Sequence, residues 1–506
     1  MAEFKRIGLS ARRAPLTMPG DLSLCLQNET DPVAAGDDLS LTLCRAGAGD
    51  NLSLLYLTGP AERLAPLRPL LPAGLRGIGI PWRVSAGDVG GSAILSRLAD
   101  DILSALLIGA RPLSRWRSRF LAVLRGPAGC LPTGLGAGPV AMADEGAQER
   151  RYWLPGLAEV MQPSFPDRPG LLSTSWTGPA PVLSLTRRGE TWHLPLTHLM
   201  LHAAPGGLFV LEWGIEGAGW PTDAESGQPF WQQVAGLDSG QRQEPAPRTL
   251  AELLDLNAAL RPLYTAYEMP PAARDTHRLQ LGDDVLCDMT MGAVPGQEGP
   301  WRALAGLMLA PWGLKATDVA LMQDERARLV GAVTPLGPPP PDLPPVTADW
   351  RVMLGRFSGV DPFAPTPAYD PDWSAAELDR SLYDRFSTLG SRYMVTDHSL
   401  TLVGHGDFAA EVGGRHLTGL YRRLFLVALL RAAAAQGIRA DLARLPDAEA
   451  VGDITRLWRP FLLTLGQGPM TGQMQGSELF SRMLDATTAD TLLAEALSLL
   501  DRASAG

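Results

Sequence analysis

The sequence predicts an α+β protein, in which a mixed half of sheets and helices precedes a mainly helical C-terminal domain. Before residue 335, several short runs alternate apolar and polar residues with period two, as half-buried strands do. After residue 345, apolar residues recur at helical spacing over long stretches. Between these regions, seven of the eleven residues from Pro335 to Pro345 are proline, and such a run continues neither a helix nor a central strand.

These changes of pattern divide the chain into four parts. We expect an α+β domain over residues 1–150, a second α+β unit over 151–334, a proline-rich linker over 335–345 and a mainly helical domain over 346–506. A ferredoxin-like arrangement is one option for the N-terminal half. Whether that half forms one domain or two stays open.

In the N-terminal half, the patterns predict strands, helices and a hairpin. Strands are expected over 22–26, 39–44 and 54–57, and an amphipathic helix over 91–109. Two apolar runs flank Pro205-Gly206-Gly207 and predict a hairpin over 199–213. Thr249 and Glu252 match a capping box, which predicts a helix over 249–267.

In the C-terminal region, the patterns predict four helices and two short strands. The helices are expected over 374–386, 416–435, 449–465 and 476–502. The strands are expected over 393–395 and 400–403. Long helices with short connections favour antiparallel packing.

Composition excludes several classes of protein. Of 506 residues, 45% are hydrophobic and the net charge is −10, which argues against a disordered chain and against a dedicated nucleic-acid coat. The chain has only two lysines, Lys5 and Lys315, and no glycine-rich loop precedes Lys315. This argues against a P-loop NTPase and against a protein kinase.

Targeting features and cysteines predict a soluble, cytoplasmic protein. The four cysteines form no C-x-x-C pair, which is typical of reduced, partly buried thiols. The first twenty residues carry no apolar signal region. The most apolar run, residues 424–430, is far shorter than the roughly 20 residues that span a membrane, so we expect a buried core helix there.

Two histidines have the helical spacing of a zinc site, but the local pattern argues against one. His198 and His202 lie four residues apart between Pro195 and Pro205, in a segment that reads as a strand. On a strand, residues i and i+4 share a face but lie about 13 Å apart. We therefore predict no metal site and no cofactor.

A second polar group offers acid–base chemistry. Asp397-His398 and His405-Gly-Asp407 each place a carboxylate beside an imidazole, and Arg392 is available for an anionic substrate. Hydrogen-bonded turn residues are the simpler interpretation. If these side chains converge within about 4 Å, the protein is an enzyme of unrecognised class.

Four arginines surround a tryptophan near the end of the first predicted domain. Arg111, Arg115, Arg117 and Arg119 could bind a phosphate or a nucleic acid. They could equally cover a helix surface by stacking and by burying their side-chain stems.

The region from about Leu378 to Leu500 resembles the CorA-like family of bacterial proteins, after the magnesium channel. The resemblance rests on four separated pieces, together about a quarter of the chain: Tyr383-Asp-Arg385 with Gly390-Ser-Arg-Tyr393, His416-Leu-Thr-Gly-Leu-Tyr421, the run from Leu424 to Arg431, and Gln473-Met-Gln-Gly-Ser-Glu-Leu-Phe480. The hairpin over 199–213 is also similar to one in the family's soluble half. The resemblance implies a fold and a habit of oligomerising. It does not imply ion conduction, because the chain has neither the membrane helices nor the Gly-Met-Asn loop.

The predicted C-terminal helices suggest how such an oligomer would form. Apolar residues on one helix face call for a partner helix, and we expect an interface at Leu424, Val427, Ala428, Gln473, Gln475 and Phe480. The two glutamines precede a helix start, where capping of backbone groups fits better than setting the register of an interface. We therefore expect a non-enzymatic regulatory or scaffold protein that forms homo-oligomers and can bind a protein partner.

Overall fold

The structure is a computed structural model. It describes residues 7–9, 22–27, 39–45, 52–58, 68, 71–79, 82–104, 113–127, 138–143, 151–161, 170–187, 190–217, 250–264, 274–324, 326–335, 350–360, 371–404, 406, 408–444 and 451–505. Helices and sheets both contribute throughout, so the predicted α+β class is confirmed.

The N-terminal part forms a five-stranded sheet in the order β1-β2-β3-β4-β5. Only β2 and β3 pair in parallel. The three predicted strands are present, and α3 occupies most of the predicted helix. The bounds are β1 Ile7–Leu9, β2 Leu22–Gln27, β3 Leu39–Arg45, β4 Leu52–Thr58, β5 Trp82–Ser85, α2 Ala86–Val89 and α3 Ser92–Ser104.

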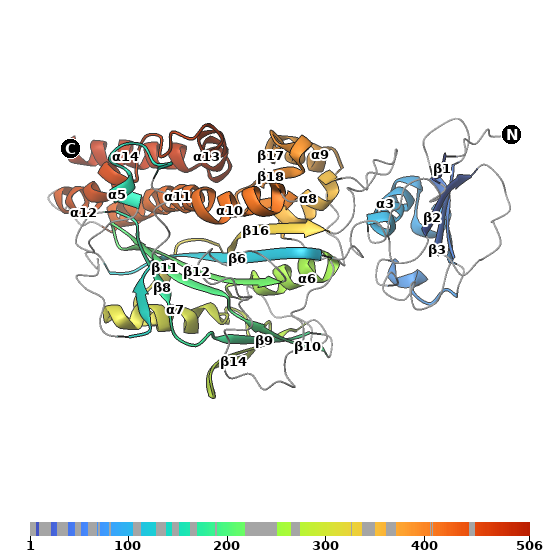
Figure 1. Ribbon diagram of the computed structural model, residues 1–506, viewed down its shortest axis with the longest axis horizontal. Helices are drawn as coiled ribbons and strands as arrows, with labels where there is room; N and C mark the ends of the chain where they lie inside the picture. Colours follow the sequence, from blue (N-terminus) through green and yellow to red (C-terminus); the bar gives the residue numbers. More distant parts are fainter. Residues whose placement is uncertain are drawn as a thin grey trace.

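A ten-stranded sheet forms the centre of the molecule (Figure 1). Its order is β17-β18-β19-β16-β6-β12-β11-β8-β7, with β15 also paired to β6. All pairs are antiparallel except β16 with β19. The bounds are β6 Leu113–Arg125, β7 Val140–Met142, β8 Leu172–Trp176, β11 His198–Ala204, β12 Leu208–Gly217, β15 Ala320–Leu321, β16 Arg328–Pro335, β17 Leu382–Tyr383, β18 Ser391–Val395 and β19 Ser399–Gly404.

This sheet corrects the predicted domain boundaries. Strand β6 precedes residue 150 but pairs with β12, and β16 precedes the proline run but pairs with β19 behind it. The divisions at 150 and at 335–345 therefore do not separate independent sheets. In the region after 345, the two predicted strands are present as β18 and β19, and together with β17 they extend the central sheet.

Helices cover both faces of the central sheet (Figure 1). Even-numbered residues of β6, such as Phe120, face a core shared with α6 (Leu250–Leu260) and α7 (Trp301–Leu309). Odd-numbered residues, such as Leu121 and Val123, face a second core shared with the C-terminal helices.

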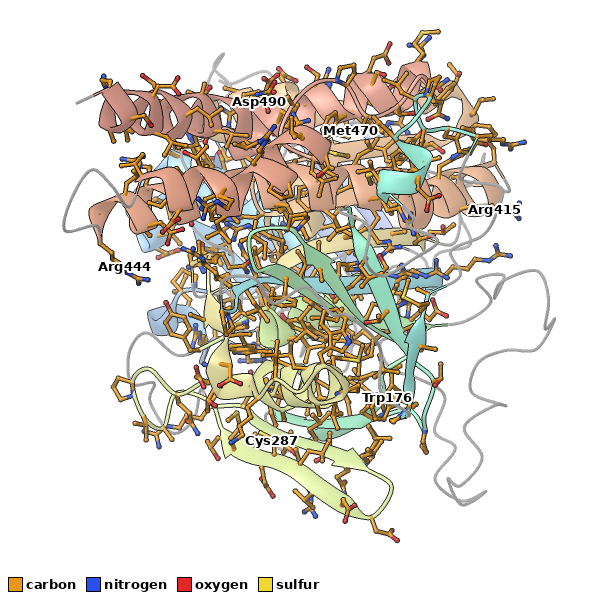
Figure 2. The ribbon with its side chains drawn as sticks, turned by 90° about the vertical axis from the view of Figure 1, so that its left-hand side faces the viewer. Trp176, Cys287, Arg415, Arg444, Met470 and Asp490 are labelled. Carbon is orange, nitrogen blue, oxygen red and sulfur yellow. The ribbon has the colours of Figure 1, made fainter. Side chains whose placement is uncertain are left out.

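The C-terminal helical layer begins with a helix of mixed type. Two π-helical segments, η9 (Phe408–Gly413) and η10 (Leu417–Tyr421), flank the short α10 (Gly414–His416). They lead into α11 (Arg422–Ala443), and Figure 2 labels Arg415 and Arg444 at opposite ends of this helix. The helices that follow are α12 (Val451–Thr464), α13 (Met474–Thr487) and α14 (Ala489–Ala505). Residues 424–430 are buried, as predicted for a core helix.

A smaller antiparallel sheet of four strands, in the order β10-β9-β13-β14, lies below α7 in Figure 1. Its bounds are β9 Val182–Arg187, β10 Glu190–Pro195, β13 Thr276–Leu281 and β14 Asp284–Thr290. The shorter helices are α5 (Ala158–Met161), α8 (Trp350–Gly359), α9 (Pro371–Ser381), η2 (Ala73–Leu75), η6 (Ala310–Trp312), η7 (Ala316–Asp318) and η8 (Ser387–Leu389). Within the described ranges, no helix has the length and hydrophobicity needed to cross a membrane.

Trp458 of α12 joins the helical layer to the sheet. Its ring is fully buried between Gly437 of α11 and Gly206 in the turn between β11 and β12. A Cβ atom at either glycine would lie within 2.6 Å of the ring. Arg125 of β6 stacks over the ring at 5.3 Å and forms a two-point ion pair with Asp441, which also accepts the indole N–H. Position 206 also favours glycine because its φ of 88° lies in the left-handed region.

Candidate functional site

A buried carboxylate, Glu212, lies at the centre of the most unusual polar cluster in the described part of the chain. Glu212 is on β12, on the face covered by α11, and its side chain has no solvent exposure. His202 Nε2 lies 2.9 Å from Oε2, and His198 Nε2 lies 2.8 Å from Oε1. Two guanidinium groups complete the surroundings: Arg422 Nη1 lies 2.5 Å from Oε2, and Arg119 Nη1 lies 3.4 Å from Oε1. We call these five residues the Glu212 network.

Strand register explains how the network forms. Glu212 pairs with Met200 of β11, so it lies midway between His198 and His202. In the next row, Gly214 separates His198 from Arg119 of β6. A Cβ on Gly214 would lie 3.0 Å from Arg119 Cγ and 3.2 Å from His198 Cβ. The missing side chain at Gly214 therefore lets both residues lean over β12 towards the carboxylate.

The second nitrogen of His202 also has a partner. Ser173 Oγ of β8 lies 2.8 Å from His202 Nδ1. Because Nε2 faces a carboxylate, we assign the ring hydrogen to Nε2, and Nδ1 then accepts from the Ser173 hydroxyl. Serine, histidine and glutamate are thus linked in series. However, Ser173, His202 and Glu212 are all buried between the sheet and the helices, which favours a structural role over nucleophilic catalysis.

Burial and neighbouring charges fix the protonation of the network. Burial lowers the pKa of His198 to about 3 and also lowers the pKa of His202, while Arg119 and Arg422 act in the same direction. Burial alone would raise the pKa of Glu212, but Arg422 and the two histidines hold it well below its usual value. Near pH 7 the network therefore holds one carboxylate, two neutral imidazoles and two guanidinium groups.

We expect acid to destabilise the protein below pH 6.5. The folded-state pKa of His198, about 3, lies below its value of about 6.5 in an unfolded chain, so the unfolded state binds the extra proton between these limits. His198 alone then lowers the free energy of unfolding progressively as the pH falls from 6.5 towards 3. Thermal unfolding over a pH series tests this, and His198→Gln should show a shallower dependence. An unfolding midpoint that stays constant from pH 7 to pH 4.5 would contradict the assignment.

The structure confirms the strand predicted around the two histidines, but Glu212 was not among the predicted site residues. Residues four apart on β11 lie about 13 Å apart along the strand. Both imidazoles nevertheless contact the same side chain, because Glu212 on the neighbouring strand lies between them. The available signal was an acidic residue inside the apolar run Leu208–Trp213. Among the residues described, no group of three or more histidine, cysteine, aspartate or glutamate side chains is arranged to hold a metal.

A second polar cluster gathers most of the pieces that carry the CorA-like resemblance. Tyr383, Tyr393, Tyr421 and His416 form a chain of rings, with centroids 6.2, 5.7 and 5.7 Å apart in that order. The hydroxyl of Tyr383 donates to Glu478 Oε2 at 2.5 Å, and Arg385 pairs with Oε1 of the same carboxylate. We call these six residues the tyrosine cluster.

Gln473 lies at the edge of the tyrosine cluster and does not act as predicted. It is the N-cap residue of α13, but its side chain makes no capping hydrogen bond. Its side chain instead lies beside Tyr421, where it partly offsets the rise of the Tyr421 pKa to about 12 that burial causes. Gly476 is the closely packed residue here, because a Cβ would lie 2.9 Å from Thr471 Cγ2 and 3.0 Å from Gln473 Oε1. Gln475 is half-buried one residue earlier.

Only part of the predicted acid–base group falls on residues that the structure describes. His398 Nδ1 lies 3.5 Å from Asp397 Oδ2 in the turn before β19. Arg392 lies on β18 and pairs with Val403 of β19. It is three residues, or about 10 Å along the strand, from Val395 at the turn end of the hairpin. Burial, with Arg261 and Arg328, lowers the pKa of His398, which weakens it as a base near pH 7. His405 and Asp407 lie outside the described residues.

The arginine-rich run is a central strand, so the helix interpretation was wrong. Arg115, Arg117 and Arg119 alternate along β6 on the face towards the C-terminal helices. Arg117 pairs with Glu216 at 2.6 Å and Arg119 contacts Glu212, so neighbouring carboxylates already engage both. This arrangement argues against an open nucleic-acid patch. Arg111 lies outside the described residues.

The apolar residues expected at an interface between chains belong to the core of one chain. Leu424, Val427 and Ala428 have no exposure, and Phe480 is 4% exposed beneath the guanidinium of Arg431. The partner of this helix is therefore internal: the central sheet on one side and α13 and α14 on the other. Figure 2 shows these layers, with Asp490 of α14 above the helix that runs from Arg415 to Arg444.

Comparisons with known proteins identify no relative for this chain. No protein-family model, no curated protein and no solved structure matches it.

Proposed function

We propose that the protein is a non-enzymatic scaffold or regulatory protein of the cytoplasm, similar to the soluble part of CorA-like proteins, that assembles with copies of itself through its C-terminal helices. One observation carries the proposal. The separated motifs of the resemblance, from Tyr383 to Glu478, meet in the single tyrosine cluster. Motifs that are far apart in sequence but join in space support one shared structural module over chance matches.

The chemistry of the buried groups supports a non-catalytic role. His202, Glu212 and Ser173 lie beneath the helical layer, and their polar atoms are engaged with one another. Catalytic groups must instead reach a substrate within hydrogen-bonding distance. The network is better suited to holding α11 in register on the sheet.

The assembly surface must differ from the one predicted from the sequence, because Leu424 and Phe480 are buried within the chain. The outer sides of the C-terminal helices still present large apolar side chains to solvent: Leu463 of α12 is 74% exposed, Met474 of α13 is 58% exposed and Leu499 of α14 is 37% exposed. Exposed apolar groups favour association when they form part of a larger patch. We therefore place self-assembly on this outer side.

Light scattering on surface variants tests this assignment. Leu463→Glu and Met474→Glu should each lower the average molar mass of the assembled protein, because they place a charge where apolar surface would be buried. Val285→Glu on β14 is a matched control, since Val285 is 45% exposed but lies on the four-stranded sheet, and it should leave the mass unchanged. If the double variant Leu463→Glu/Met474→Glu keeps the wild-type mass, assembly does not use these helices.

A further inference from the structure

Strand β14 forms an open edge of the four-stranded sheet. It pairs with β13 on one side, and no other strand in the described part of the chain pairs with it. Figure 1 shows β14 at the lower margin of the molecule, on the side opposite the C-terminal helices. An edge strand leaves backbone N–H and C=O groups with which another extended chain can pair.

The other terminal strands of the described sheets are less suited to such pairing. Strands β1, β5, β7 and β17 each have four residues or fewer. Strand β10 has six residues and ends in Pro195, which has no N–H. Strand β14 has seven residues and contains no proline. Because short strands and prolines are common means of blocking an edge, β14 is the most open edge among the described sheets.

The side chains of β14 determine which kind of strand fits beside it. On β13, Arg278 and Gln280 share a face of the sheet, and they pair with Asp288 and Val285 of β14. Asp288 and Val285 therefore lie on one face, where the Asp288 side chain is 55% exposed and Val285 is 45% exposed. On the opposite face, Cys287 packs against the core. A strand added at this edge meets one acidic and one apolar side chain on its outer face.

The edge is acidic along its length. Asp283 and Asp284 are exposed at the turn that opens β14, and no described basic side chain forms an ion pair with either. Asp288 lies 3.8 Å from Arg278, and both side chains are exposed, so water screens this pair. A second copy of the chain would bring the same carboxylates to the edge, and like charges on adjacent strands are unfavourable. The charges therefore discourage self-pairing and favour a basic strand.

We propose that β14 is a docking edge for an extended, basic segment of a partner protein, which joins the four-stranded sheet as a fifth strand. Backbone hydrogen bonds along the edge supply affinity, while a basic side chain beside Asp288 and an apolar one beside Val285 supply specificity. The proposal goes beyond self-assembly, which we place on the C-terminal helices. Either proposal can fail without the other.

Fluorescence anisotropy tests the proposal on the full-length protein, with a labelled peptide of about eight residues that alternates lysine and valine. We expect saturable binding that weakens at high salt. Asp284→Lys/Asp288→Lys should weaken this binding about tenfold or more, because attraction becomes repulsion. The same variant should bind a peptide that alternates glutamate and valine, which the wild type does not bind. Asp453→Lys/Glu495→Lys is the matched control: it changes the net charge equally at exposed positions of α12 and α14, and should bind the lysine peptide as the wild type does.

Three results would overturn the proposal. The first is the absence of saturable binding of the lysine peptide to the wild-type protein at up to about 1 mM, a measurement that does not depend on any variant. The second is equal binding of that peptide by wild type and by Asp284→Lys/Asp288→Lys. The third is equal binding of a fully N-methylated lysine–valine peptide, which keeps the charges but has no N–H donors for strand pairing.

Discussion

Glu212→Gln should lower the free energy of unfolding by about 3–5 kcal/mol, the typical cost of removing one partner of a buried ion pair. The substitution keeps the shape of the side chain but removes a negative charge that contacts both Arg119 and Arg422. The new amide group would also point N–H donors at a site already surrounded by donors. Urea unfolding followed by tryptophan fluorescence measures the loss, since Trp213 is next to Glu212 in β12.

Glu216→Gln is the matched control for this prediction. Glu216 lies two residues after Gly214 on β12 and forms an ion pair with Arg117 of β6. Its side chain is 17% exposed. Partial exposure to water reduces the value of an ion pair, so we expect a loss of about 1 kcal/mol or less. If Glu212→Gln costs no more than Glu216→Gln, the network does not hold the sheet and the helical layer together.

Trp458→Ala should cost about 3–5 kcal/mol, as large-to-small substitutions of buried aromatic residues do. Three elements lose their contact with the ring at once, because Gly206 and Gly437 lie close to its six-membered ring and Arg125 stacks over it. The cavity cannot close easily, since both glycines lack side chains that could fill it. Asp441 would also lose the indole N–H as a donor.

Trp373→Ala provides the comparison for this prediction. Trp373 lies on α9 and is 55% exposed, so its loss should change the unfolding midpoint far less. Gly437→Val adds volume at the same contact. It should lower the free energy of unfolding as much as Trp458→Ala does, because the added side chain overlaps the ring. If Trp458→Ala and Trp373→Ala have similar unfolding midpoints, the packing of Trp458 between the two glycines does not stabilise the fold.

Local patterns predicted the elements well, and the reason is physical. Period-two alternation located β2, β3 and β4, and Pro205-Gly206-Gly207 located the hairpin of β11 and β12. Pairing between segments that are far apart in the sequence produces no such local pattern. Strands β6 and β12, or β16 and β19, are adjacent only because the folded chain brings them together. The domain boundaries drawn from composition therefore failed.

In the candidate site too, individual residues were predicted but the contacts between distant segments were not. The sequence singled out His198, His202 and Arg119 separately, but their common partner Glu212 comes from a neighbouring strand at a register that spacing alone does not reveal. The apolar face of α11 was recognised, but whether its partner was another chain or the same chain depended on the central sheet, which the sequence did not reveal. Gln473 was placed correctly at a helix start, yet its side chain makes no capping hydrogen bond.

The molar mass of the wild-type protein in solution tests the central claim most directly. Light scattering over a series of protein concentrations should give a stable multiple of the 54.1 kDa chain mass, as a self-assembling scaffold requires. A mass of one chain at every concentration would contradict the proposed function.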